Sequence, residues 1–299
     1  MNPKPWPWNK LGKPCPADWG VGLTICIAAV CAHKGEEAII CVSDRKVSMG
    51  GYYSADQMIT KTDPVGDAWV SMFSGDDMSS VVPILERIRS KSMVHYDEEN
   101  TVSKMSDIVV EAYQTERKRR VEQGLLSRFS LDTESFNKIG QQVLGHRHAA
   151  MCDKISNYDL KCQLLMAGFD NKQHGHVFTV SNPGECENYD KINFWAIGSG
   201  EHAALSQLFF FGYNRNAPLS ICVYQVLVAK YMAESAEGVG PNTFALVMHN
   251  ADCVSFIQTE AEAKVRRSWD RITKVPQRAL TVIEEEMKRT KADFRESPG

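Results

Sequence analysis

Residues 24–44 read TICIAAVCAHKGEEAIICVSD, and this stretch decides the fold. Two runs of β-branched and apolar residues, 24–32 and 38–43, predict two buried strands. The short polar segment around Gly35 that separates them predicts a hairpin. The stretch therefore places Thr24 at the start of the first strand and Asp44 at the end of the second.

Outside this hairpin, strands and helices are expected in alternating blocks. Further strands are predicted at residues 68–73, 162–168, 176–180, 193–197, 243–249 and 253–257. Helices are predicted after a cap at Asp76 or Asp77, and at 103–123, 200–211, 220–234 and 260–291. Residues 130–158 favour no element. Groups of strands separated by pairs of helices predict two antiparallel sheets with helices on their outer faces, rather than βαβ units.

Composition excludes several classes of function. The formal net charge is −3 and the pI about 6.3, so nothing indicates a nucleic-acid-binding protein. The basic run at residues 117–120 is interpreted as a solvated helix face. No apolar run reaches the ~20 residues that cross a membrane, and the N-terminus lacks the apolar core of a secretory signal. We therefore expect a cytoplasmic protein without membrane or nucleic-acid partners.

The N-terminal segment and the cysteines add two expectations. Residues 1–22 hold five prolines, so we expect an extension that is a propeptide, disordered, or not translated, ahead of a domain at 23–299. The nine cysteines are odd in number and lack a C-x-x-C pair. They are interpreted as reduced, mostly buried thiols, and no cofactor or metal is expected.

Three polar residues stand beside the predicted strands and point to chemistry. Thr24 and Asp44 flank the hairpin, and Lys61 precedes the next buried strand, so the three side chains could converge. A buried lysine needs a carboxylate partner, and a hydroxyl beside such a pair is a candidate nucleophile. A structural ion pair between Asp44 and Lys61, beside an ordinary strand threonine, is the alternative.

Seven motifs carry a resemblance to a known family. In the first half they are TICIAAV, VSDRKVS, KTDP and WVSMFSGDD; in the second half they are LLMAGFD, AIGSGEHA and AKYMAESAEGVG. In this order and spacing, over residues 24–257, the chain resembles a bacterial proteasome β-type subunit. The resemblance implies an α+β fold, the four-layer αββα sandwich of the N-terminal-nucleophile (Ntn) hydrolases.

The resemblance also implies roles for individual residues. Thr24 matches the catalytic N-terminal threonine, Lys61 the catalytic lysine, and Asp44 the aspartate that orients it. Gly75 matches the glycine whose N–H builds the oxyanion hole, and Ser199 the serine near the threonine amine. The family's Asp-x-x-Ser-Gly segment is matched loosely, with Glu234 in place of the aspartate and Glu237 in place of the serine.

The implied function is a threonine-type peptidase, which acts on peptide or protein substrates in a homo-oligomeric ring, with an ATPase as a further partner. Its mechanism uses the free α-amine of the threonine, with a pKa near ~8, as the base. Here Leu23 precedes Thr24, so that amine requires cleavage after Leu23 or a translation start at that residue. A non-catalytic subunit of the same fold and a small-amide hydrolase are the alternatives.

Other residue groups permit different chemistry. Cys26 lies on the strand of Thr24, and Cys31 follows it, so either thiol could be proposed as a nucleophile. His146 and His148 with Cys152 are residue types that bind zinc, as are His174 and His176. The spacing of these groups matches no standard zinc signature.

Overall fold

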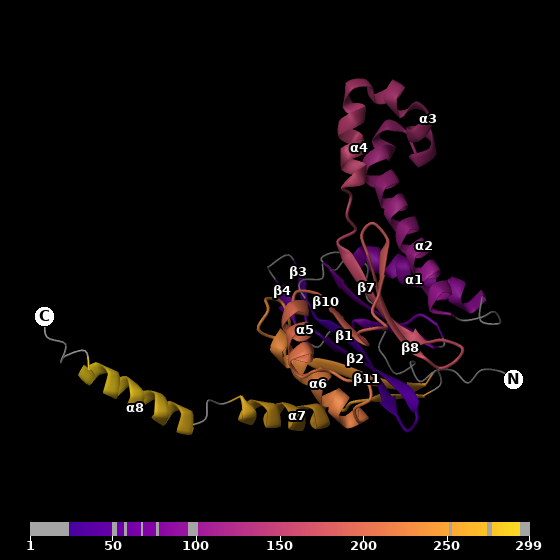
Figure 1. The fold of residues 1–299 in the computed structure, drawn as a ribbon. Coiled ribbons are helices and arrows are strands. Elements are labelled where there is room, and N and C mark those ends of the chain that lie inside the picture. Colours follow the sequence, from indigo (N-terminus) through magenta and orange to yellow (C-terminus); the bar gives the residue numbers. More distant parts are fainter. Residues whose placement is uncertain are drawn as a thin grey trace, which may run out of the picture. The chain divides into compact units, whose positions relative to one another are not determined.

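The computed structural model describes residues 24–49, 53–56, 59–66, 68–75, 78–94, 101–250, 253–273 and 277–293. These residues form an α+β protein with two antiparallel five-stranded sheets, a two-stranded sheet and helices (Figure 1). The expectation of two antiparallel sheets is confirmed. The proline-rich segment 1–22 and the predicted cap at Asp76 or Asp77 lie outside the described residues.

The first sheet is built around the predicted hairpin. Its strand order is β10-β1-β2-β11-β12. The strands are β1 (Cys26–His33), β2 (Glu36–Asp44), β10 (Phe194–Ile197), β11 (Thr243–Asn250) and β12 (Cys253–Phe256). Lys34 and Gly35, both with positive φ (54° and 86°), connect β1 to β2. Two such residues in a row make the tight turn that matches the twist of a hairpin, so the predicted hairpin is confirmed.

The second sheet has the order β5-β6-β7-β8-β9. Its strands are β5 (Thr62–Pro64), β6 (Trp69–Gly75), β7 (Cys162–Phe169), β8 (Gly175–Ser181) and β9 (Glu185–Asn188). The pair β3 (Val47–Met49) and β4 (Tyr53–Ala55) forms the small sheet. The sequence did not predict β3, β4 or β9, which are short.

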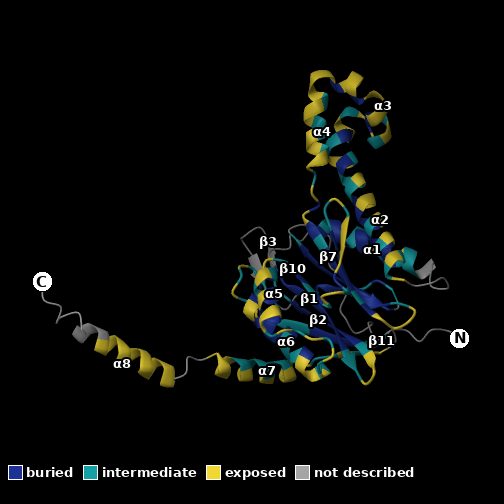
Figure 2. Cartoon of the chain, viewed as in Figure 1, coloured by how far each residue is buried: buried dark blue, intermediate teal, exposed yellow. Residues whose placement is uncertain are grey.

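The main core lies between the two large sheets. Residues of β1 and β2 contact β7 and β8, and one cluster of buried apolar side chains includes members of both sheets. Figure 2 shows these strands as buried. Helices α1 (Met78–Val94) and α2 (Val102–Val121) contact the second sheet, and α5 (Glu201–Phe210) and α6 (Leu219–Ala233) contact the first. Burial of these apolar side chains is the main contribution to the stability of the fold.

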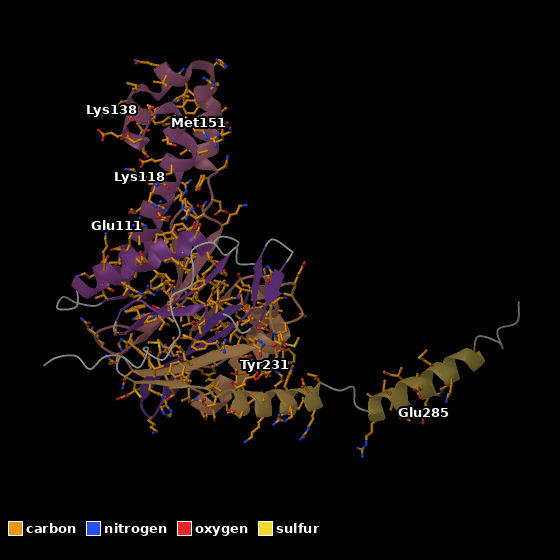
Figure 3. The ribbon with its side chains drawn as sticks, turned by 180° about the vertical axis from the view of Figure 1, so that it is seen from behind. Glu111, Lys118, Lys138, Met151, Tyr231 and Glu285 are labelled. Carbon is orange, nitrogen blue, oxygen red and sulfur yellow. The ribbon has the colours of Figure 1, made fainter. Side chains whose placement is uncertain are left out.

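A helical lobe follows α2. It comprises a π-helical turn η2 (Glu122–Leu126), a 3-10 turn η3 (Ser127–Phe129), α3 (Thr133–Leu144), a second 3-10 turn η4 (Gly145–Arg147) and α4 (His148–Ser156). Five buried side chains form its own core: Val121, Leu126, Leu131, Phe136 and Leu144. Figure 3 labels Lys118 on α2 and Met151 in the lobe. Residues 130–158, for which the sequence favoured no element, are thus largely helical.

The described residues from Thr259 onward form a second unit with two helices, α7 (Thr259–Ile272) and α8 (Gln277–Asp293). Both are charged helices with internal ion pairs; in α7 Arg266 Nη2 lies 3.2 Å from Glu262 Oε1. The sequence had predicted one helix over 260–291. Within the described ranges, no helix is long and apolar enough to cross a membrane.

The prediction of a four-layer αββα sandwich of the Ntn type is wrong. The structure has two antiparallel five-stranded sheets plus helices, and the helices that contact the sheets are only part of the helical structure. The apolar side chains of α3 pack within the lobe rather than on a sheet, and α7 and α8 belong to a separate unit. The resemblance that implied the layers rests largely on motifs in strands, and it carries no information on helices such as α3 that pack elsewhere, which explains the error.

Candidate active site

Thr24, Asp44 and Lys61 come together at one end of the two sheets. Thr24 precedes β1 and Asp44 ends β2, so the hairpin register places them side by side, with the Asp44 N–H donating to Ile25 O at 3.2 Å. Lys61 precedes β5 and reaches the pair from the other sheet, where its carbonyl accepts from the Phe73 N–H. The residue exposures are 1% for Thr24 and 0% for Asp44 and Lys61.

The three side chains share direct contacts. Lys61 Nζ donates to Asp44 Oδ1 at 2.8 Å, and it also donates to the Thr24 hydroxyl oxygen. The Thr24 hydroxyl donates its own proton to the same Asp44 Oδ1. The hydroxyl is therefore held between an ammonium and a carboxylate, with its oxygen facing the cation.

Backbone donors complete the environment of Asp44. The Ile25 N–H donates to Oδ1 at 3.0 Å. The N–H groups of Lys46 and Gly240 donate to Oδ2 at 3.0 and 3.2 Å. A buried carboxylate is tolerated only when it is paired and hydrogen-bonded, and these contacts meet that requirement. In a water-poor interior the attraction between Lys61 and developing negative charge on Thr24 is stronger than at a surface.

The Gly198–Gly200 turn packs against the backbone carbonyl of Thr24. The Gly200 N–H donates to Thr24 O at 3.3 Å. The Ser199 hydroxyl lies 3.4 Å from that oxygen and 2.9 Å from Glu237 O. Gly198 has φ of +106°, and a Cβ there would lie 2.2 Å from Thr24 O. Only glycine permits this approach, so the turn fixes the position of Thr24.

Gly75, the predicted oxyanion residue, ends β6 on the same sheet as Lys61. Its φ is +143°, and a Cβ there would lie 2.1 Å from Lys161 O and 2.7 Å from Cys162 Cα. Its glycine identity is therefore explained by the close approach of the chain entering β7. Whether its N–H stabilises an oxyanion stays a prediction.

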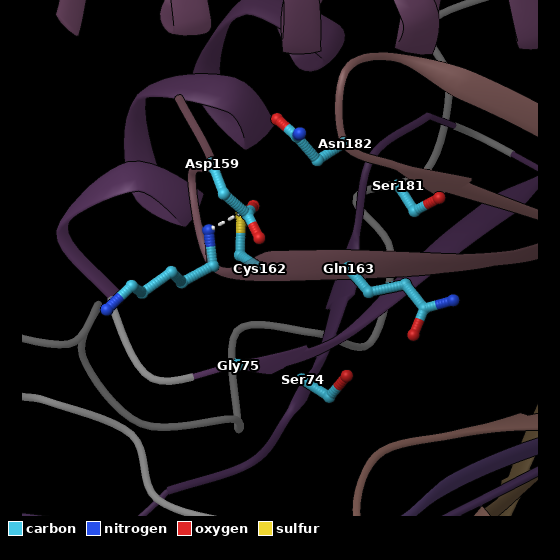
Figure 4. Close-up of a pocket in the computed structure, with 8 residues that line it drawn as sticks. Ser74, Gly75, Asp159, Cys162, Gln163, Ser181 and Asn182 are labelled. Carbon is cyan, nitrogen blue, oxygen red and sulfur yellow. Dashed lines mark hydrogen bonds between the residues drawn. The ribbon is translucent and has the colours of Figure 1, made fainter. Parts of the chain in front are cut away.

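A cavity of about 400 Å³ adjoins Gly75 (Figure 4). Eight residues line it: Ser74, Gly75, Asp159, Lys161, Cys162, Gln163, Ser181 and Asn182. In Figure 4 the dashed line joins Asp159 to the Lys161 N–H, a bond of 2.8 Å. Thr24, Asp44 and Lys61 do not line this cavity, whereas Gly75, another candidate site residue, does.

Solved structures place this architecture among known folds. The chain matches Anbu from Hyphomicrobium sp. strain MC1, solved as a Gly-1 mutant, with a TM-score of 0.57. The fold resembles that of Anbu. The match covers 85% of this chain and 98% of the Anbu chain at 11% sequence identity. No protein-family model and no curated protein sequence matches the chain.

Anbu is a bacterial proteasome-like protein, so the likeness agrees with the resemblance of the motifs at the level of fold. An identity of 11% shows the fold alone and transfers no residue roles. The roles of the site residues must therefore be argued from their own geometry.

Glu234 and Glu237, the loosely matched residues, take different positions. Glu234 Oε1 accepts from Lys230 Nζ at 2.5 Å. Glu237 contributes its backbone carbonyl, to which Ser199 donates. The structure therefore shows Glu234 as an ion-pair partner and Glu237 as a backbone contact, and a direct role of either carboxylate stays a prediction.

The alternative nucleophiles are poorly suited to attack. The Cys26 thiol donates to Phe73 O at 3.4 Å, and burial raises its pKa to about 12. It is therefore protonated at neutral pH, whereas the reactive species is the thiolate. A hydrogen bond with the Cys222 side chain, together with burial, raises the pKa of the Cys31 thiol far above its ordinary value.

The described residues contain no cluster of ligands that would support the zinc alternatives. Among the described residues, no group of three or more His, Cys, Asp or Glu side chains could hold a metal ion. His148 stacks on Phe136 with ring centroids 5.0 Å apart. His176 Nδ1 bonds to Asp190 Oδ2 at 2.7 Å. These histidines are explained by packing and ion pairing.

Sequence reasoning missed two residues near the site, Gly240 and Lys230. Gly240 donates to Asp44, and Lys230 is a fully buried lysine bonded to the same loop. The glycine run at 238–240 was a detectable signal, because closely spaced glycines often permit close backbone contacts. Helix α6 carries apolar residues on every side, so its pattern does not indicate which face is buried. The sequence therefore did not single out Lys230.

Proposed function

We propose that this chain is a threonine-nucleophile amide hydrolase of the peptidase type, active once Thr24 is the N-terminal residue. One observation carries the proposal: the Thr24 hydroxyl is buried between the Lys61 ammonium and the Asp44 carboxylate. A hydroxyl in an ordinary strand has no need of a buried ion pair, whose formation costs desolvation energy. The fold likeness to Anbu supports the proposal at the level of superfamily.

Each residue has a role in the proposed reaction. The free α-amine of Thr24 accepts the hydroxyl proton, directly or through a water, while the oxygen attacks the substrate carbonyl. Lys61 stabilises the negative charge that develops on that oxygen, and Asp44 orients Lys61. The Gly75 N–H is the proposed donor to the tetrahedral oxyanion. The tetrahedral intermediate collapses to an ester on the Thr24 oxygen as the C–N bond breaks, and the departing amine takes the proton held by the α-amine. Water then hydrolyses the ester, which releases the acid product and restores the Thr24 hydroxyl.

The α-amine must first be freed, because Thr24 is joined to Leu23 by a peptide bond. One route is self-cleavage after Leu23: the Thr24 hydroxyl attacks the Leu23 carbonyl, the Leu23–Thr24 amide bond breaks to leave an ester and a free α-amine, and water hydrolyses the ester. Leucine at this position adds bulk that the glycine usual in the family lacks. The other route is a translation start at Leu23, followed by removal of the initiator residue. Both routes yield a mature chain that begins at Thr24.

The proposed assembly is a homo-oligomeric ring that acts on peptide or protein substrates, with an ATPase as a further partner. The resemblance to proteasome β-type subunits and the proteasome-like fold support the ring. Light scattering of the purified chain with multi-angle detection measures the mass of the particle directly. A monomer at every concentration would contradict this part of the proposal.

A second candidate is a non-catalytic subunit of the same fold. The peptide bond between Leu23 and Thr24 favours it, because a chain that keeps this bond has no free threonine amine. A small-amide hydrolase with the same nucleophile is separated from a peptidase by assay of short peptides against small amides.

Mass spectrometry of the full chain, purified from its native source, tests the proposal together with hydrolysis of a fluorogenic peptide library. We expect an N-terminal Thr24 and a turnover that Thr24→Ala lowers by roughly a thousandfold or more. Thr62→Val is the matched control, because the buried Thr62 hydroxyl has no hydrogen-bond partner among the described residues. An intact Met1 on assembled, active material would overturn the threonine mechanism.

A further inference from the structure

Lys230 is a buried cation that the proposed reaction does not use. It lies on α6 with an exposure of 0%. Its ammonium donates to Glu234 Oε1 at 2.5 Å and to the carbonyls of Gly240 and Pro241, both at 2.9 Å. These acceptors match the three N–H donors of a lysine. A buried lysine is costly, so three good acceptors indicate a site built to hold it.

Gly240 connects this cation to the proposed active site. Its carbonyl accepts from Lys230, and its N–H donates to Asp44 Oδ2 at 3.2 Å. A Cβ on Gly240 would lie 2.6 Å from Lys46 Cβ and 3.0 Å from Asp56 Oδ2. The backbone can reach Asp44 only because residue 240 is glycine, and Lys230 fixes the carbonyl of that same residue.

The other end of the loop also contacts the site. Glu237 O accepts the Ser199 hydroxyl, and Ser199 belongs to the turn that packs on Thr24. A single loop, residues 237–241, therefore lies against both the Asp44 carboxylate and the turn that holds Thr24. Lys230 donates to the Gly240 and Pro241 carbonyls, on the Asp44 side of this loop.

We infer that Lys230 is a positioning residue of the Thr24 site, which acts through the Gly240 backbone to hold a hydrogen-bond donor on Asp44. The inference rests on the proposed function of Thr24, Asp44 and Lys61. Lys230 keeps the loop at the distance that Asp44 Oδ2 requires. With Oδ2 fixed by Gly240 and Lys46, Oδ1 stays directed at Lys61 and Thr24. Glu234 has a supporting part, because it balances the charge of Lys230.

Two measurements on the full chain test the inference. The first is amide hydrogen exchange, which does not depend on catalysis. In Lys230→Met we expect the Gly240 N–H to exchange at least about tenfold faster, while strands β6 to β8 keep their wild-type rates. Glu116→Gln is the matched control, since it alters another buried charge and should leave residues 237–242 unchanged. Unchanged exchange at Gly240 in Lys230→Met would overturn the inference.

The second measurement is the kinetics of peptide hydrolysis. We expect Lys230→Met to lower kcat about tenfold and to leave KM within about twofold, because the loop orients Asp44 rather than substrate. Glu234→Gln should lower kcat less, because Lys230 loses its counter-charge and holds the two carbonyls less firmly but is not removed. A rise in KM alone, or no kinetic change despite faster Gly240 exchange, would contradict positioning of Asp44.

The two outcomes separate the inference from the proposed function. If the wild-type chain with Thr24 exposed hydrolyses nothing, the proposed function fails, and the exchange rate at Gly240 still decides whether Lys230 holds the loop on Asp44. If Lys230→Met loses protection throughout β6 to β8, the variant is unfolded. Glu234→Gln then takes its place, and we expect faster Gly240 exchange with protected strands. Equal exchange in Glu234→Gln and wild type would in that case reject the inference.

Discussion

Asp44 and Glu116 are both carboxylates with 0% exposure, yet their surroundings differ. Asp44 lies between the sheets, where it binds one equally buried lysine, the Thr24 hydroxyl and three backbone N–H groups. Glu116 lies on α2 and binds three arginines. The distances are 2.8 Å to Arg87 Nη1, 2.8 Å to Arg119 Nε and 2.9 Å to Arg120 Nε.

The difference teaches which buried charge is suited to chemistry. The arginines of Glu116 are 24–36% exposed, so water screens them, and no nucleophile stands between the charges. Burial alone would raise the pKa of Glu116, but hydrogen bonds from Arg119, Arg120 and Arg87 lower it to about 2. That cluster joins α1 to α2. The Asp44 cluster contains a hydroxyl and a compact ammonium, and the proposed function uses this arrangement to activate the hydroxyl oxygen.

The largest expected effect is on hydrolysis. Lys61→Met should lower kcat roughly a thousandfold, because the charge that stabilises the attacking oxygen is lost. Arg119→Met removes one cation from the Glu116 cluster and should stay within about twofold of wild type. Steady-state assays of both variants with the same peptide measure the contrast. Equal losses would show that the two clusters do not differ in function.

The next effect is on the free energy of unfolding. Asp44→Ala leaves Lys61 buried without a carboxylate and should cost about 3–5 kcal/mol. Glu116→Ala should cost less, about 1–3 kcal/mol, because its arginines are partly exposed and can regain water. Urea titrations of the full chain, fitted for both the midpoint and the slope, check the order. A larger cost for Glu116→Ala would reverse our view of which carboxylate is more isolated from water.

Acid pH provides a third test, on Glu116 alone. Its folded-state pKa of about 2 lies below the ordinary value of 4.5, so its contribution to stability is present above pH 4.5 and is lost as the pH falls toward 2. The stability difference between wild type and Glu116→Gln should therefore be constant at neutral pH and shrink below about pH 5. Urea midpoints at several pH values measure it. A stability difference between wild type and Glu116→Gln that grows as the pH falls would contradict this prediction.

The smallest effect concerns a third cluster, around His176. Burial alone would lower the pKa of His176, but its bond to Asp190 and its proximity to Asp170 raise it above 6.5. The raised pKa means that protonated His176 stabilises the folded state. This contribution is complete below pH 6.5 and is lost as the pH rises through the folded-state pKa. The advantage of wild type over His176→Gln should therefore fade on going from pH 6 to mildly alkaline pH. Thermal unfolding scans of both proteins across this range will detect the trend.

The sequence predicted the hairpin, and with it the approach of Thr24 to Asp44, from short-range patterns at the ends of strands. Lys61 reaches this pair from the other sheet, and the sequence indicated only that its side chain could converge with them. It did not predict the Glu116 cluster. The basic run at 117–120 was interpreted as a solvated helix face, whereas Arg119 and Arg120 bind the buried Glu116 and Arg117 binds backbone carbonyls at the end of α4. Those contacts depend on how α1 and α4 pack on α2, which a helix pattern does not encode.

The remaining part of the site was hidden for a related reason. Lys230 looks like an ordinary helix residue, and Gly240 like an ordinary turn glycine. Their importance appears only when α6 and β11 are placed beside β2, in contacts that join positions far apart in the chain. The four-layer arrangement failed as a prediction because family motifs report on the strands, while the lobe at residues 121–156 has a core of its own.

The Lys34–Gly35 turn has a consequence for the time at which the site is assembled during folding. A hairpin with a tight turn forms in microseconds, so Thr24 and Asp44, 20 residues apart, can meet early. The bond from Gly240 to Asp44 spans 196 residues, and closing so long a loop is entropically costly until most of the chain has packed. The proposed nucleophile can thus meet Asp44 early in folding, whereas the hydrogen bond from Gly240 forms late. A nascent chain still on the ribosome carries the hydroxyl and the carboxylate without the loop that steadies them.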